Sequence, residues 1–166
     1  MIVNRSTYID QLIRSKGNGL IKIITGLRRS GKSFLLKKLF RQHLLDNGVK
    51  EDHIIIIDME SRKNKPFKDP DYLLDWVEKD MKGDDTYYII IDEVQEVNDF
   101  VEVLSTLSVT EGTDVYVTGS NSRFLSSDVV TEFRGRGDEI HVWPLSFKEF
   151  MSVFPGSKED AWSEYI

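Results

Sequence analysis

Short apolar runs alternate along the chain with stretches whose apolar residues recur at helical spacing. The runs rich in β-branched and aromatic residues predict five strands, at 20–25, 53–60, 87–93, 113–120 and 138–147. The second run contains four consecutive isoleucines, which is typical of a strand that is covered on both faces. Pro144 is expected to end the fifth strand.

The intervening segments predict helices. Apolar residues share one face of 6–16, which "GNG" at 17–19 ends, and "RKNKPFKDP" at 62–70 is expected to be a charged loop. Ser146 is a candidate N-cap for a short helix. The expected helices lie at 6–16, 33–46, 71–82, 97–107 and 146–153, with another beginning at Ala161. Strands separated by helices indicate right-handed βαβ units, so the predicted fold is a three-layer α/β domain around a parallel sheet.

Composition limits the domain count and the chemistry. The chain has 166 residues, of which 40% are hydrophobic, and this suits one domain with a substantial core. We expect an N-terminal helical segment at 1–18, a core domain at 19–154, and the start of a truncated C-terminal region at 155–166. The absence of cysteine excludes disulfides and thiolate sites, and the three histidines have no metal-ligand spacing.

Net charge and hydropathy indicate the expected location of the protein and the partners it is expected not to bind. The net charge of −6 disfavours non-specific binding to nucleic acid or to anionic membranes. The polar N-terminus lacks a signal-peptide core, and no apolar run approaches the ~20 residues of a membrane helix. We therefore expect a soluble, cytoplasmic protein without a membrane partner.

A phosphate-binding motif follows the first predicted strand. The sequence "GLRRSGKS" at 26–33 fits G-x-x-x-x-G-K-[ST] and opens a predicted helix, as that motif requires. Glycines allow the backbone N–H groups to point at an anion, and the helix N-terminus favours negative charge. Lys32 can reach the β- and γ-phosphates, and Ser33 can ligate Mg²⁺. The candidate nucleotide-binding residues are Gly26, Arg29, Ser30, Gly31, Lys32, Ser33 and Phe34.

An acidic pair ends the third predicted strand, "YYIIIDE". Asp92 is placed to hold Mg²⁺, as a Walker-B aspartate does. Glu93 points the other way along the pleat and is placed to orient or deprotonate a water that attacks the γ-phosphate. Asp58 and Glu60 follow the isoleucine strand, and we expect them near the site in a secondary position.

One extra strand lies between the phosphate loop and the acidic pair. With this strand the chain resembles the additional-strand, catalytic-glutamate division of P-loop NTPases, and the resemblance implies a five-stranded parallel sheet of order 5-1-4-3-2. A GTPase would need N-K-x-D, and the sole N-K, at Asn64, is followed by Phe67 where Asp is required. The sequence therefore favours adenine over guanine.

Two further groups of residues have competing interpretations. Ser120 and Asn121 follow the fourth strand, where either side chain could hold the attacking water, or could instead cap a helix. Arg134 and Arg136 lie among glycines before the fifth strand, in what we call the arginine loop. They could stabilise phosphoryl-transfer charge in cis or in trans, or form a solvated loop. Arg28 and Arg29 could likewise contact phosphate, a partner or water alone.

Taken together, "ITGLRRSGKSFLLKKL", "IIIDEVQ", "VYVTGSNSRFLS", "FRGRGDEIHVWPLSFKEF" and "WSEYI" resemble a known family. It comprises the bacterial and archaeal AAA-type ATPases whose N-terminal ATP-binding domain precedes a C-terminal domain of unknown function. The resemblance implies binding and hydrolysis of ATP with Mg²⁺. It implies Asp92 at the metal, Glu93 as base, a sensor at Ser120 or Asn121, and a role for Arg134 or Arg136.

The leading hypothesis is thus an ATPase domain whose partners are ATP and ADP, with self-association or a protein partner through the arginine loop. A nucleotide-dependent switch or scaffold with negligible turnover is the main alternative. A small-molecule kinase and a DNA-associated ATPase stay open, although the acidic composition disfavours the latter.

Overall fold

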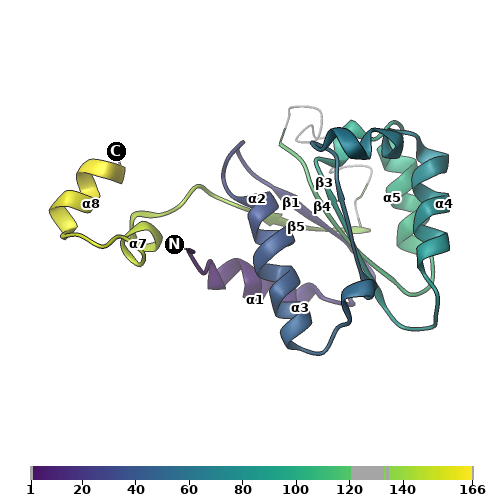
Figure 1. Ribbon diagram of the computed structural model, residues 1–166, viewed down its shortest axis with the longest axis horizontal. Coiled ribbons are helices and arrows are strands. Elements are labelled where there is room, and N and C mark those ends of the chain that lie inside the picture. Colours follow the sequence, from purple (N-terminus) through teal and green to yellow (C-terminus); the bar gives the residue numbers. More distant parts are fainter. Residues whose placement is uncertain (1, 121–132, 134, 166) are drawn as a thin grey trace.

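A computed structural model describes residues 2–120, 133 and 135–165 (Figure 1). Within these residues the strands form one five-stranded sheet in the order β2-β3-β4-β1-β5, and every neighbouring pair is parallel. This confirms the predicted fold class and the strand order 5-1-4-3-2. The strands are β1 (Ile21–Thr25), β2 (Ile54–Asp58), β3 (Tyr87–Asp92), β4 (Thr113–Thr118) and β5 (Gly137–His141).

Helices cover both faces of this sheet, and α7 and α8 extend away from it (Figure 1). The helices α1, α2 and α3 lie on one face, and α4 and α5 lie on the other. Their bounds are α1 (Ser6–Ser15), α2 (Lys32–Phe34), α3 (Arg41–Asp46), α4 (Pro70–Asp80), α5 (Phe100–Val109), α7 (Phe147–Met151) and α8 (Lys158–Tyr165). No helix in the described part of the chain is both long enough and apolar enough to cross a membrane.

The isoleucine strand shows how the two faces are built. Ile55 and Ile57 pack with Leu73 of α4 in one core cluster. Ile54 and Ile56 pack with residues of the opposite cluster. Because successive side chains of a strand point to opposite faces, a strand between two helical layers must be apolar at consecutive positions.

The helix after the phosphate loop is interrupted by a π-helical segment, η1 (Leu35–Phe40), which joins α2 to α3. The N–H group of Arg41 reaches back to the carbonyl of Leu36, five residues earlier. The sequence predicted one helix over 33–46, and apolar periodicity alone cannot reveal this change of hydrogen bonding.

Several boundaries differ from the predictions for local reasons. The expected charged loop is largely a 3₁₀ helix, η3 (Arg62–Lys68). The helix expected at 97 begins at Phe100, because Val94–Glu96 form a separate 3₁₀ turn, η4, and Asp99 has a positive φ of 50°. The fifth strand ends at His141, before Pro144.

The two C-terminal helices both begin at a capping serine. Ser146 caps α7 as predicted, with a reciprocal capping box to Glu149. The last helix, α8, begins at Lys158, three residues before the predicted Ala161. Ser157 explains the earlier start, because its hydroxyl accepts a hydrogen bond from the Asp160 N–H at 3.1 Å.

A buried polar cluster lies at the amino-terminal ends of β1 and β4. The ammonium of Lys22 is completely buried and donates to the Asp114 carboxylate and to the Leu20 carbonyl, the latter at 2.9 Å. The Tyr116 hydroxyl and the Gly17 N–H donate to the other carboxylate oxygen, at 2.8 and 2.9 Å. Burial, together with Asp114, raises the pKa of Tyr116. Each buried charge is therefore hydrogen-bonded, as a low-dielectric interior requires.

Candidate nucleotide site

The loop between β1 and α2 has backbone geometry that two glycines permit. Gly26 and Gly31 have φ values of 139° and 93°, and Arg29 lies in the left-handed region at 65°. A Cβ atom on Gly26 would come within 2.2 Å of the Val142 carbonyl oxygen. Any larger residue at position 26 would push the loop off the end of the sheet.

Lys32 lies inside the loop and is almost fully buried. Its Nζ donates to the carbonyls of Gly26 at 3.0 Å and Leu27 at 2.8 Å. Burial lowers the pKa of Lys32, and the nearby carboxylates of Glu93 and Asp92 oppose this effect. The buried Ser30 Oγ has no hydrogen-bond partner among the described residues. A hydroxyl and an ammonium are thus directed into the loop, where an anion would be bound.

Asp92, at the end of β3, is fully buried. Its Oδ1 accepts hydrogen bonds from the hydroxyls of Ser33 at 2.8 Å and Thr118 at 2.6 Å. The structure therefore brings together the two residues that the sequence assigned to a metal, and it adds Thr118 from the end of β4.

Lys37, which the sequence analysis did not single out, completes the surroundings of Asp92. Its Nζ lies 2.8 Å from Asp92 Oδ2 and 2.7 Å from Asp58 Oδ2. Burial alone would lower the pKa of Lys37, but its hydrogen bonds to Asp58 and Asp92 outweigh that effect and raise it. The sequence could have predicted this position of Lys37, because Lys37 lies four residues after Ser33 and residues at that spacing share one face of a helix.

Glu93 follows Asp92 in a left-handed conformation, with φ of 56°. Its N–H donates to Thr118 Oγ1 at 2.9 Å. Its carboxylate accepts from Ser120 Oγ at 2.9 and 3.0 Å, and also from the side-chain amide of the buried Gln95. Ser120 therefore contacts the predicted base, whereas Asn121 lies outside the described residues.

The candidate arginines lie at opposite ends of the strands. Arg28 and Arg29 are exposed and line a hollow of about 400 Å³ together with Lys32, Ser33, Phe34, Glu60 and Glu93. Arg136 is also exposed, but its carbonyl accepts from the Ile21 N–H at 2.8 Å, at the amino-terminal ends of the strands. The structure thus places Arg136 at the edge of the sheet opposite the loop, and Arg134 lies outside the described residues.

Known proteins resemble this chain in sequence. A protein family described as an AAA domain matches residues 18–151. An uncharacterized protein of Haemophilus influenzae is 36% identical over 151 residues, covering 90% of this chain and 38% of that protein. An uncharacterized protein of Methanocaldococcus jannaschii is 29% identical over 154 residues, covering 90% and 31%. The chain therefore spans about a third of the length of these two relatives.

Solved structures share the fold at low sequence identity. The Aeropyrum pernix ORC1 protein, solved in complex with DNA, superposes with a TM-score of 0.62 at 13% identity, over 99% of this chain and 50% of that one. The C. elegans PCH-2 structure gives 0.58 at 16% identity, over 88% and 43%. At such identities the likeness concerns the fold alone.

Proposed function

Because the chain belongs to the AAA domain family, we propose that it binds ATP with Mg²⁺ at the 26–33 loop and hydrolyses the γ-phosphate. One observation carries this proposal: the Ser33 hydroxyl donates to the buried Asp92 carboxylate directly beside the loop that encloses Lys32. A hydroxyl and a carboxylate are the oxygen ligands that Mg²⁺ takes in such sites, and the adjacent ammonium favours phosphate.

The residues at the loop fit both the phosphates of ATP and Mg²⁺. Gly26 lets the loop pack closely against the Val142 carbonyl, and the Ser30 hydroxyl, which has no hydrogen-bond partner among the described residues, can donate to a phosphate oxygen. Lys32 would exchange its two carbonyl acceptors for phosphate oxygens. Ser33 and Asp92 would hold Mg²⁺, which when bound neutralises charge on the phosphates.

In this proposal Glu93 takes the proton of the attacking water. Ser120 holds the Glu93 carboxylate by its hydroxyl, and Thr118 fixes the Glu93 backbone, so the base is oriented before the substrate arrives. No covalent intermediate is needed, because positioning and charge stabilisation account for phosphoryl transfer.

We place the adenine of ATP in a hollow of about 610 Å³, one of whose lining residues, Arg5, contacts the loop. Asn4, Tyr8 and Trp143 line it, and Arg5, also in its lining, donates from Nη1 to the Ser30 carbonyl of the loop at 2.6 Å. Aromatic rings and an amide supply the stacking and hydrogen bonding that a purine requires. The absence of a guanine-reading motif favours adenine.

Arg136 cannot serve this site from within the same chain, because it lies at the opposite edge of the sheet. We propose that any contribution of Arg136 is made to a neighbouring copy, which would make turnover depend on self-association. A chain that turns over slowly at low concentration and faster at high concentration would support this idea.

The test is Glu93→Gln, compared with Glu96→Gln, an exposed glutamate on the following turn. Binding of a fluorescent ATP analogue should persist in both variants. Phosphate release without an added acceptor should fall about 10²-fold or more in Glu93→Gln alone. If the parent binds ATP but both it and Glu93→Gln release phosphate equally slowly, the chain is a switch. If release needs a second substrate it is a kinase, and stimulation by DNA would mark a DNA-associated ATPase.

A further inference from the structure

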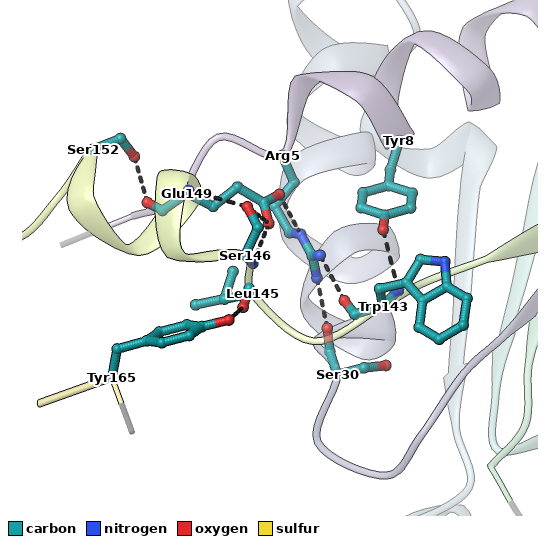
Figure 2. Close-up of polar contacts among 9 residues, drawn as sticks. All are labelled: Arg5, Tyr8, Ser30, Trp143, Leu145, Ser146, Glu149, Ser152 and Tyr165. Atoms are coloured by element: carbon teal, nitrogen blue, oxygen red, sulfur yellow. Dashed lines mark hydrogen bonds and ion pairs between the residues drawn. The ribbon is translucent and has the colours of Figure 1, made fainter. Parts of the chain in front are cut away.

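Arg5 is buried and joins three separate parts of the chain (Figure 2). Its Nη1 donates to the Ser30 carbonyl at 2.6 Å, and its Nη2 donates to the Trp143 carbonyl at 2.6 Å. Its Nε pairs with Glu149 Oε1 at 3.1 Å. The guanidinium therefore contacts the phosphate loop, the segment that leaves β5, and helix α7 at the same time.

Tyr8, on the first turns of α1, reinforces this arrangement. The Arg5 guanidinium lies 4.6 Å from the centre of the Tyr8 ring. The Tyr8 hydroxyl accepts from the Trp143 N–H at 3.1 Å, so both backbone groups of Trp143 are held by the N-terminal segment. Arg5 itself adopts the left-handed conformation, with φ of 38°, which a non-glycine residue takes only when its surroundings hold it there.

The contacts continue from Arg5 to the end of the described chain. Glu149 also accepts from the N–H and hydroxyl of Ser146 at 2.8 and 3.0 Å, which fixes the start of α7. The Tyr165 hydroxyl of α8 donates to the Leu145 carbonyl at 2.7 Å (Figure 2). Hydrogen bonds thus lead from the phosphate loop through Arg5 to α7, and a separate hydrogen bond joins α8 to Leu145, the residue before the N-cap of α7.

We propose that Arg5 is a positioning residue that couples the phosphate loop to the segment 143–153, so that ATP in the loop holds this segment more firmly. This inference rests on the proposed function, because it takes ATP as the ligand of the loop. The guanidinium is a rigid planar fork, so a shift of the Ser30 carbonyl alters its geometry toward Trp143 and Glu149 together. Coupling of this kind is reciprocal: the held segment must in turn raise the affinity for ATP.

A purely structural clamp would behave differently from a coupling residue. Removing a clamp would loosen the 143–153 segment equally with and without ATP. Removing a coupling residue abolishes the difference between the two states, even at ATP concentrations that saturate the loop. The decisive measurement is therefore the ATP-dependent change in amide hydrogen exchange over 143–153.

The experiment uses the 166-residue chain with and without saturating ATP and Mg²⁺. We expect ATP to change exchange over 143–153 in the parent, and Arg5→Met to lose that change while binding ATP roughly tenfold more weakly. Glu149→Gln should lose most of the change, since glutamine still serves the capping box but forfeits the ion pair. Arg14→Met, an exposed arginine of the same N-terminal segment, is the control and should match the parent.

The outcomes separate the two proposals. An equal ATP-dependent change in Arg5→Met and the parent would overturn the coupling, and so would ATP binding to the parent without any change over 143–153. Failure of the parent to bind ATP would overturn the proposed function itself. Should Arg5→Met not fold, Arg5→Lys decides the question, because one ammonium cannot reach all three acceptors and must lose at least half of the change.

Discussion

The Nζ atom of Lys37 lies 2.8 Å from Oδ2 of Asp92, the carboxylate that we propose to hold Mg²⁺. Asp92 is completely buried, so this ammonium is its compensating charge within the described chain. We expect Lys37→Met to lower the free energy of unfolding by about 2 kcal/mol, less than for a fully buried pair because Lys37 retains some exposure.

Mg²⁺ should partly replace the missing charge in that variant. Thermal unfolding with ATP, measured with and without Mg²⁺, should therefore show a larger stabilisation by Mg²⁺ in Lys37→Met than in the parent. Lys38→Met is the matched control, because Lys38 is the exposed neighbour on the same helix. Equal stabilisation by Mg²⁺ in all three proteins would show that Lys37 does not influence the proposed metal site.

Ser120 should affect the rate of hydrolysis more than ATP binding. Its hydroxyl holds the Glu93 carboxylate at 2.9 Å, so Ser120→Ala leaves the proposed base less well oriented. We expect kcat to fall about tenfold with little change in KM. Ser108→Ala removes a hydroxyl that donates to the Ser105 carbonyl within α5 and should leave both constants unchanged. A raised KM with an unchanged kcat would assign Ser120 to substrate binding instead.

Gly26→Ala should destabilise the chain and abolish ATP binding. The new Cβ would lie 2.2 Å from the Val142 carbonyl oxygen, and the φ of 139° is unfavourable for alanine. The expected loss in unfolding free energy is about 3 kcal/mol or more. Gly48→Ala is the comparison, because Gly48 has a φ of 87° but its Cβ position has no atom of the described residues within 4 Å. It should lose only about 1 kcal/mol and bind ATP normally, as denaturant titration and nucleotide binding can show.

Asp114→Asn should be among the most destabilising substitutions of the sheet. It leaves the completely buried Lys22 ammonium without its carboxylate. The expected loss is roughly 3 to 5 kcal/mol by urea denaturation. The double variant Lys22→Met with Asp114→Asn should recover part of that loss, because no uncompensated charge remains. A double variant that is no more stable than Asp114→Asn would refute this explanation.

Stability at acidic pH should depend on Glu149. Partial burial alone would raise its pKa, but hydrogen bonds from Ser146 and the charge of Arg5 lower it below the ordinary value of 4.5. A depressed folded-state pKa stabilises the fold above the unfolded pKa, and this contribution disappears as the pH falls through the folded pKa. As the pH falls below about 4.5, the parent should therefore lose more stability than Glu149→Gln, measured by thermal unfolding. Parallel pH profiles for the two proteins would contradict this.

Much of the fold could be predicted because local and global signals agree. The apolar runs lie between helical patterns, and parallel strands placed the 26–33 loop and the Asp92–Glu93 pair at one edge of the sheet. The meeting of Ser33 with Asp92 follows from that topology. The helix boundaries were less predictable. The start of α5 depends on the positive φ of Asp99, and the start of α8 depends on the hydrogen bond that the Ser157 hydroxyl accepts. Neither feature alters the apolar periodicity of the sequence.

The parts of the site that were not predicted depend on contacts between distant residues. Arg5 looks like an ordinary polar residue before a helix, and only the folded chain brings it to Ser30 and Trp143. From the sequence, Arg136 could stabilise phosphoryl-transfer charge in cis or in trans, or lie in a solvated loop. Because β5 runs parallel to β1, Arg136, which precedes β5, lies at the amino-terminal ends of the strands, whereas the 26–33 loop lies at their carboxyl ends.

The π-helical segment Leu35–Phe40 affects how this helix aligns with the corresponding helix of related chains. Hydrogen bonds that span five residues rather than four absorb one inserted residue without unravelling the helix. Deleting that residue would rotate the stretch before the insertion by about 100° relative to the stretch after it. Lys37 would then no longer point toward Asp92 while Leu44 kept its place in the core. Related chains with an uninterrupted α-helix at this position should therefore be one residue shorter here, and should also lack a lysine facing the aspartate that we propose to hold Mg²⁺.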